Sequence, residues 1–259
     1  MPNPIVIGQV LTPQYSPGLV ALSYFVSFAG SLTALMCASR MLKADGRAKF
    51  SMLACAAVAL GGIGIWSMHF IGMLAYQLPV RIVYEPVLTG VSLVAAVLIS
   101  GIALYLAGGA RKFNKPGWIA ASILAGLGVC VMHYMGMYAM KLRAAMELDL
   151  DIVAVSVGIA ITAAAAALWL AFHTNNLVRQ MIAAAVMALA VCTMHYVGMS
   201  AATMICIAPT AASGMTLGGS DLVLVVFSVV GLVLISIFWL ITDVDMTIKR
   251  KPLVVARHG

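Results

Sequence analysis

The string Met-His-Phe-Ile-Gly-Met at residues 68–73 is one of three closely related copies in the chain, and this repetition indicates how the fold is built. The second copy reads Met-His-Tyr-Met-Gly-Met at residues 132–137, and the third reads Met-His-Tyr-Val-Gly-Met at residues 194–199. The shared pattern is Met-His-[Phe/Tyr]-x-Gly-Met, and its histidines are 64 and 62 residues apart. This period is the length of two membrane-crossing helices with their connections, so we expect a fold built from two-helix repeats.

The composition of the chain is that of a membrane protein. Of its 259 residues, 63% are hydrophobic and 9% are charged, whereas soluble domains are about 45–50% apolar and about 25% charged. A water-soluble fold of this size could not bury so much apolar surface. The composition also excludes a disordered chain. The cysteines number five, an odd count, and most lie in apolar runs, which argues against a disulfide framework.

Seven apolar runs, each long enough to cross a bilayer, are separated by polar residues or by proline and glycine. They are Leu19–Leu42, Phe50–Tyr76, Pro86–Ala107, Trp118–Met140, Ile152–Phe172, Val178–Met204 and Leu222–Ile241. The motif copies fall in the second, fourth and sixth runs. The predicted fold is therefore an all-α membrane protein with seven transmembrane helices, arranged as three two-helix repeats plus a seventh helix. We expect an extracytoplasmic segment at 1–18, the membrane domain at 19–242 and a short cytoplasmic tail at 243–259.

The distribution of lysine and arginine predicts the orientation of the helices. Three basic residues, Arg81, Lys141 and Arg143, fall in the connections on one side. The other twelve fall on the opposite side, and they are Arg40, Lys43, Arg47, Lys49, Arg111, Lys112, Lys115, Arg179, Lys249, Arg250, Lys251 and Arg257. The positive-inside rule then predicts the N-terminus outside and the C-terminus in the cytoplasm of a bacterial inner membrane. The net charge of +7 reflects this topology in the lipid bilayer, and no nucleic-acid partner is expected.

The three motif histidines are predicted to form one metal site. Parallel repeats place His69, His133 and His195 at the same depth, and we expect their ring nitrogens to lie within about 4 Å of one another. On a helix, the methionine four residues after each histidine shares its face; these are Met73, Met137 and Met199. The methionine before each histidine lies at the border of that face; these are Met68, Met132 and Met194. All nine side chains are candidate ligands.

Two further features belong to this face. Cys130 and Cys192 stand three residues before their histidines and are candidate accessory ligands, whereas the first repeat has Trp66 at that position. The motif glycines are expected to let neighbouring helices approach closely; these are Gly72, Gly136 and Gly198.

Imidazole and thioether groups without a carboxylate suit copper best, Cu(I) through methionine and Cu(II) through histidine. Zinc would use the imidazoles but gains little from thioethers. Magnesium and calcium prefer oxygen ligands and are disfavoured. Haem bound through histidine or through histidine and methionine is the alternative cofactor, although three histidines at one depth suit a compact site better.

The motif on alternate helices of a seven-span bundle resembles the MHYT-domain family of bacterial integral membrane sensors. This resemblance implies a copper site near the outer face, formed by the motif methionines and histidines, that senses oxygen, carbon monoxide or nitric oxide. Family members are often fused to cytoplasmic output domains that act on cyclic di-GMP. The chain departs from the pattern at Phe70, where the family name implies tyrosine, and residues 242–259 are too few for an output domain.

The expected function is a sensor of redox state or diatomic gases that is not an enzyme and signals through a separate protein. A copper-handling transporter or chaperone is the first alternative, but transport requires ligands at several depths. A copper or haem membrane oxidoreductase is the second alternative. A retinal protein is excluded, because the seventh run, Leu222–Ile241, contains no lysine for a Schiff base. Catalytic triads, phosphate loops and paired carboxylates are also absent from the sequence.

Overall fold

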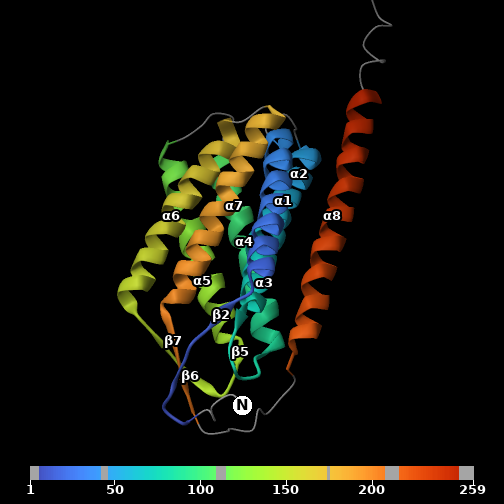
Figure 1. Cartoon of the computed structure of the whole chain (residues 1–259). Helices are drawn as coiled ribbons and strands as arrows, with labels where there is room; N and C mark the ends of the chain where they lie inside the picture. Colours follow the sequence, from blue (N-terminus) through green and yellow to red (C-terminus); the bar gives the residue numbers. More distant parts are fainter. Residues whose placement is uncertain (1–5, 42–45, 109–114, 174–175, 208–215, 251–259) are drawn as a thin grey trace, which may run out of the picture.

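The computed structural model is a helical bundle, and it confirms the all-α fold with seven membrane-crossing helices (Figure 1). It describes residues 6–41, 46–108, 115–173, 176–207 and 216–250. Within these ranges, seven helical segments are long and apolar enough to cross a membrane. The chain is therefore a multi-pass membrane protein.

Six of the seven spans are α-helical throughout, and the second changes helix type along its length. The α-helical spans are α1 (Pro17–Met41), α4 (Pro86–Gly108), α5 (Lys115–Tyr138), α6 (Leu150–His173), α7 (Leu177–Ser200) and α8 (Gly219–Arg250). The second span consists of α2 (Gly46–Ala57), the π-helix η1 (Val58–Ser67) and α3 (Met68–Ala75). π-Helical segments are rare in proteins, and those that occur often lie at functional sites. Here the segment ends directly before the first motif copy.

Polar side chains fix where several helices begin, because the first backbone N–H groups of a helix have no partner within it. Glu85 precedes α4 and accepts hydrogen bonds from the backbone N–H groups of Val87 and Leu88, at 2.9 and 2.6 Å. These bonds, the one from Leu88 first, hold the pKa of the Glu85 carboxyl below its ordinary value. Asn176 has the same role before α7, where its side chain accepts from the N–H of Val178 at 2.9 Å.

Six spans form a closed ring, and α8 lies outside it. Neighbours around the ring are α1, η1 with α3, α4, α5, α6 and α7, and α7 packs back against α1. The three motif helices α3, α5 and α7 also contact one another across the ring. Helix α8 packs mainly on η1, with further contacts to α3 and β4 (Val83–Tyr84), and stands at the side of the bundle in Figure 1. The motif copies therefore meet at the centre of the ring.

Glycine permits the closest helix contacts of the ring. A Cβ atom at Gly30 of α1 would lie 2.7 Å from the Cα of Gly64 in η1. A Cβ atom at Gly126 of α5 would lie 2.5 Å from the Cα of Ile161 in α6. At both positions any larger residue would push two helices apart, which is the usual role of small residues between membrane helices.

One end of the bundle is closed by three short β-structures, which we call the β-cap. The cap contains β1 (Val10–Leu11), β2 (Gln14–Tyr15), β3 (Tyr76–Gln77), β4, β5 (Met140–Lys141), β6 (Ala144–Leu148) and β7 (Ala202–Cys206). The strands pair antiparallel in the order β1-β7-β6, β2-β3 and β4-β5. The cap follows the C-terminal ends of all three motif helices and lies at the same end of the bundle as the N-terminal segment (Figure 1).

The structure corrects the predicted end of the sixth span. The apolar run Val178–Met204 predicted a continuous helix, but α7 ends at Ser200 and residues 202–206 form strand β7. This strand pairs with β6 on one side and β1 on the other, with Ile205 opposite Val10. Backbone pairing with two partners from distant parts of the chain outweighs the local apolar pattern.

The structure also extends the seventh helix. The apolar run predicted Leu222–Ile241, whereas α8 continues to Arg250. Hydropathy marks the segment that prefers lipid, but it does not mark the end of a helix, and the sequence contains no proline or glycine between Ile241 and Pro252. The additional residues carry the helix beyond the apolar segment.

Candidate metal centre

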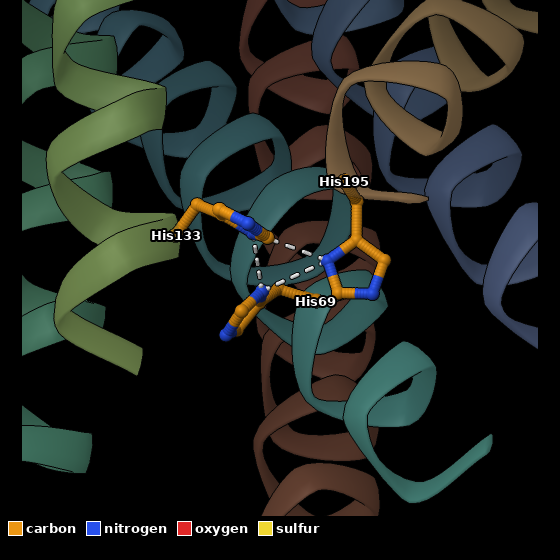
Figure 2. A group of neighbouring side chains, drawn as sticks. All are labelled: His69, His133 and His195. Atoms are coloured by element: carbon orange, nitrogen blue, oxygen red, sulfur yellow. Dashed lines mark hydrogen bonds between the residues drawn. The ribbon is translucent and has the colours of Figure 1, made fainter. Parts of the chain in front are cut away.

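The three motif histidines meet at the centre of the ring (Figure 2). His69 comes from α3, His133 from α5 and His195 from α7, and all three are buried. Their Nδ1 atoms form a triangle with sides of 3.1, 3.2 and 3.2 Å. The rings stand nearly perpendicular to one another, at angles of 80–89°. The structure therefore brings together the three side chains that the repeat placed at one depth.

The triangle of nitrogens has the geometry of a metal-binding group. A neutral imidazole carries at Nδ1 either a proton or a lone pair. Among three such atoms at least two are alike, so at least one of the three short contacts cannot be a hydrogen bond. Three nitrogens bound to one ion at about 2.0 Å with tetrahedral angles lie about 3.3 Å apart, close to the observed spacing. The histidine triad can therefore hold a metal ion.

Each motif glycine makes room for the imidazole of another repeat. A Cβ atom at Gly136 would overlap Nε2 of His69, one at Gly198 would overlap Nε2 of His133, and one at Gly72 would overlap Nε2 of His195. The three contacts form a cycle that passes through all three repeats.

The role of the motif glycines in helix packing stays a prediction, and the cycle adds that each glycine accommodates an imidazole from another helix. Close approach of helix backbones occurs elsewhere, between α1 and η1 and between α5 and α6. Within the part of the chain that the structure describes, none of the three Nε2 atoms has a hydrogen-bond partner. The orientation of each ring is therefore set by its close fit over a glycine and not by a hydrogen-bonded carboxylate or carbonyl, which is the usual support of a metal-bound histidine.

The six motif methionines are all buried around the triad helices. Four of them belong to the hydrophobic cluster that also contains Trp66 and Phe70, and they are Met73, Met132, Met137 and Met199. Met194 packs with Cys130 in a separate small cluster, and Met68 is 1% exposed. Cys192 is buried as well. Ligand roles for the sulfur atoms remain predictions.

A second repeated pattern, which the sequence analysis missed, supports the motif tyrosines. Tyr134 lies 2.8 Å from the hydroxyl of Ser156 in α6, and Tyr196 lies 3.0 Å from the hydroxyl of Ser23 in α1. Each serine donates to the carbonyl three residues before it, so each tyrosine hydroxyl is the donor. The serine is the seventh residue of its helix in both cases, and this position is the signal that could have revealed the pairs.

Comparison with known proteins supports the repeat. The profile of the MHYT family, described as a bacterial signalling protein N-terminal repeat, matches residues 62–120 and 126–184. The chain belongs to the MHYT family. The matched segments contain the first two motif copies, and the third, at residues 194–199, takes the equivalent place in the triad. No solved structure matches the chain.

Several curated MHYT relatives are signalling proteins. The chain is 36% identical over 252 residues to MucR of Pseudomonas aeruginosa, a bifunctional diguanylate cyclase/cyclic di-GMP phosphodiesterase, covering 95% of this chain and 36% of the relative. It is 35% identical over 193 residues to NbdA of the same species, a cyclic di-GMP phosphodiesterase, covering 72% of this chain and 24% of the relative. An uncharacterized signaling protein of Caulobacter vibrioides is 30% identical over 226 residues, covering 87% and 28%. The chain thus spans about a third or less of these relatives.

The structure explains the departure from the MHYT pattern at Phe70. Phenylalanine has no hydroxyl to bond Ser92, the seventh residue of α4 and the counterpart of the serines in α1 and α6. The indole N–H of Trp66 donates instead, to the Ser92 hydroxyl at 3.0 Å and to the carbonyl of Thr89 at 3.2 Å. Trp66 occupies the position of the two cysteines in the other repeats and packs on Phe70, with ring centroids 4.8 Å apart. Two substitutions in the first repeat therefore compensate for each other.

Two tyrosines of the β-cap cover the triad end of the ring. Tyr76 follows α3 and is 2% exposed, and burial, with a contribution from nearby Tyr15, raises the pKa of Tyr76 to about 12. Tyr84 is equally buried and packs on Phe70, with centroids 6.0 Å apart, and burial raises its pKa above the ordinary value. Both phenols stay neutral at physiological pH, so neither tyrosine adds a charge near the triad.

Proposed function

We propose that the chain is the sensor unit of a bacterial inner-membrane signalling protein, with copper held by the histidine triad and redox state or a diatomic gas as its signal. The observation that carries the proposal is the triangle of three buried Nδ1 atoms, 3.1–3.2 Å apart. Ionisable side chains within a membrane are costly and mark functional sites. Three of them at equivalent positions of a repeat are difficult to explain by packing alone.

Copper is favoured by the chemistry of the surrounding side chains. The motif methionines lie around the triad helices, and thioether ligands favour Cu(I), whereas zinc gains little from them. A copper ion bound there would supply one-electron redox chemistry and affinity for small gases. The chain itself supplies the imidazole ligands, the glycine contacts that orient them, and a buried site from which water is excluded.

The arrangement of the helices supports a route by which a signal could pass from the triad to the C-terminal end of α8. The triad lies near the β-cap, which the distribution of basic residues predicts to be the outer end, with residues 1–18 extracytoplasmic. Helix α8 packs on η1, directly before His69, and runs away from the cap. We propose that α8 carries the signal to the cytoplasmic side. Its receiver there is an enzyme of cyclic di-GMP metabolism, the activity named for MucR and NbdA, present as a separate protein or further along the same polypeptide.

The two alternatives have less support. A transporter needs successive sites, and the described residues contain one cluster of three or more histidine, cysteine or acidic side chains that could hold a metal, the triad itself. An oxidoreductase with bis-histidine haem needs two nitrogens on opposite faces of the iron, about 4 Å apart with the porphyrin between them. Imidazole nitrogens in mutual contact leave no space for that plane.

Metal analysis of the purified protein tests the proposal. The chain is purified in detergent from copper-replete cells, and copper, zinc and iron are measured together with an optical spectrum. We expect about one copper per chain and no Soret band, loss of the metal in His133→Ala, and full retention in His173→Ala. His173 is an exposed histidine at the end of α6 far from the triad. A Soret band, zinc as the bound metal, or unchanged copper in a folded His133→Ala variant would overturn the assignment.

A further inference from the structure

The ring of helices encloses an apolar cavity of about 70 Å³ next to the histidine triad. All six spans of the ring contribute to its wall: α1, η1, α4, α5, α6 and α7. Eleven of the lining residues are alanines, among them Ala34, Ala103 and Ala164. The cavity depends on these small residues, because a leucine at one of these positions would project into it.

The position of the cavity relative to the triad follows from helical periodicity. Ile65, Val129 and Val191 all line it. Each of them stands four residues before a motif histidine, which is one turn earlier on the same helix face. The cavity therefore begins one turn beyond the triad on the side away from the β-cap, towards the middle of the membrane. Met194, directly before His195, lines it as well.

The chemistry of the wall selects the occupant. Among the described residues, the lining contains no charged side chain, and Ser100 provides its one side-chain hydroxyl. A buried water needs about two to four polar partners, and cavities lined by aliphatic groups stay dry. An engineered apolar cavity of roughly 150 Å³ binds benzene or xenon, so a cavity of about half that volume suits a smaller apolar molecule.

We propose that this cavity is a binding site for one small uncharged molecule of the diatomic-gas class, held one helical turn from the histidine triad. Molecules of this class dissolve in the hydrocarbon of the bilayer and reach the ring from the lipid. The cavity holds such a molecule beside the triad, whereas the β-cap covers the opposite side. This inference rests on the proposed function, because the molecule held in the cavity would be the signal that reaches the metal.

Xenon binding to the metal-free, full-length protein in detergent tests the cavity without relying on the metal. The variant is Ala164→Leu, which fills the cavity, and the matched control is Ala166→Leu, which changes an exposed residue on the same helix. We expect saturable xenon binding to the wild type by ¹²⁹Xe nuclear magnetic resonance, a loss of affinity of tenfold or more in Ala164→Leu, and no change in Ala166→Leu. If Ala164→Leu does not fold, Ala34→Val introduces a smaller obstruction, with the same expected direction.

The outcomes separate this inference from the proposed function. Absence of saturable xenon binding to the wild type, or wild-type binding by folded Ala164→Leu, would overturn the cavity site even if copper is bound. Xenon binding that the filling variant abolishes would support the cavity site even if metal analysis finds no copper. In the copper-loaded protein, Ala164→Leu should keep its copper and bind carbon monoxide or nitric oxide at least tenfold more slowly than Ala166→Leu. Equal rates for the two variants would show that the cavity does not supply the triad.

Discussion

The contact between Gly136 and His69 predicts that a single added methyl group disrupts the metal site. In Gly136→Ala, the new Cβ would overlap Nε2 of His69 and lie 2.9 Å from its Cδ2, whereas ordinary contacts are 3.4 Å or longer. The imidazole must therefore move by about 1 Å, or α3 and α5 must separate, and overpacking of this kind costs about 1–3 kcal/mol. Metal sites tolerate displacements of about 0.2 Å, so we expect copper affinity to fall by about 5- to 150-fold.

The assay is a copper titration against a competing chromophoric chelator, with thermal unfolding measured on the same samples. The matched control is Gly158→Ala in α6, an exposed position where the added Cβ meets nothing within 4 Å. Gly72→Ala and Gly198→Ala should behave like Gly136→Ala, because they face the other two histidines in the same way. Wild-type copper affinity in folded Gly136→Ala would show that the glycine contact does not position the ring.

Three further predictions concern Trp66, the metal ligands and Tyr76. Trp66→Phe removes the hydrogen bonds to Ser92 and to the Thr89 carbonyl and should lower the unfolding free energy by about 1–3 kcal/mol. Adding Phe70→Tyr should restore part of this loss, because it supplies a hydroxyl for Ser92. A double variant as unstable as Trp66→Phe would contradict the compensation. Imidazole must be neutral to bind metal and has an ordinary pKa of about 6.5, whereas thioethers do not titrate. If methionines are ligands, mild acid should therefore remove Cu(II) before Cu(I). Equal loss of both forms would argue against methionine as a ligand. Burial raises the pKa of Tyr76 to about 12 in the folded protein. The stability that the neutral Tyr76 phenol contributes is therefore complete below pH 10 and is lost as the pH rises towards 12. The thermal midpoint of the wild type should fall in that range more steeply than that of Tyr76→Phe.

The helices and the meeting of the histidines could be predicted from the sequence because both depend on periodicity. Apolar runs of about 20 residues give the spans, and a motif repeated every second span places its members at one depth on parallel helices. His69, His133 and His195 then have few alternatives to facing the same axis. Their Nδ1 spacing of 3.1–3.2 Å falls inside the limit of about 4 Å that a shared ion imposes.

Features that depend on contacts between distant elements could not be predicted from the sequence. The motif glycines were predicted as helix-packing residues because small residues usually have that role, but their contacts with the imidazoles of other repeats could not be predicted from local sequence. The β-cap was not predicted, because its strands are two to five residues long and pair with partners far away in the sequence. Strand β7 in particular has no alternation of polar and apolar residues that would distinguish it from the apolar helix before it.

The first repeat differs from the other two in several ways, and these differences coincide with the position of α8. It alone has the π-helix η1, and it has Trp66 and Phe70 where the others have cysteine and tyrosine. It is also the repeat on which α8 packs. In the cycle of contacts, a shift of His195 acts on Gly72 and a shift of His69 acts on Gly136, so any change at the triad reaches α3. A ligand shifts such a bundle only through its different affinity for two packings, and η1, a π-helix between two α-helices, is the segment of the triad helices best suited to have two. If the triad senses a signal, its effect on the C-terminal helix is therefore expected to pass through residues 58–67, the π-helical segment on which α8 packs.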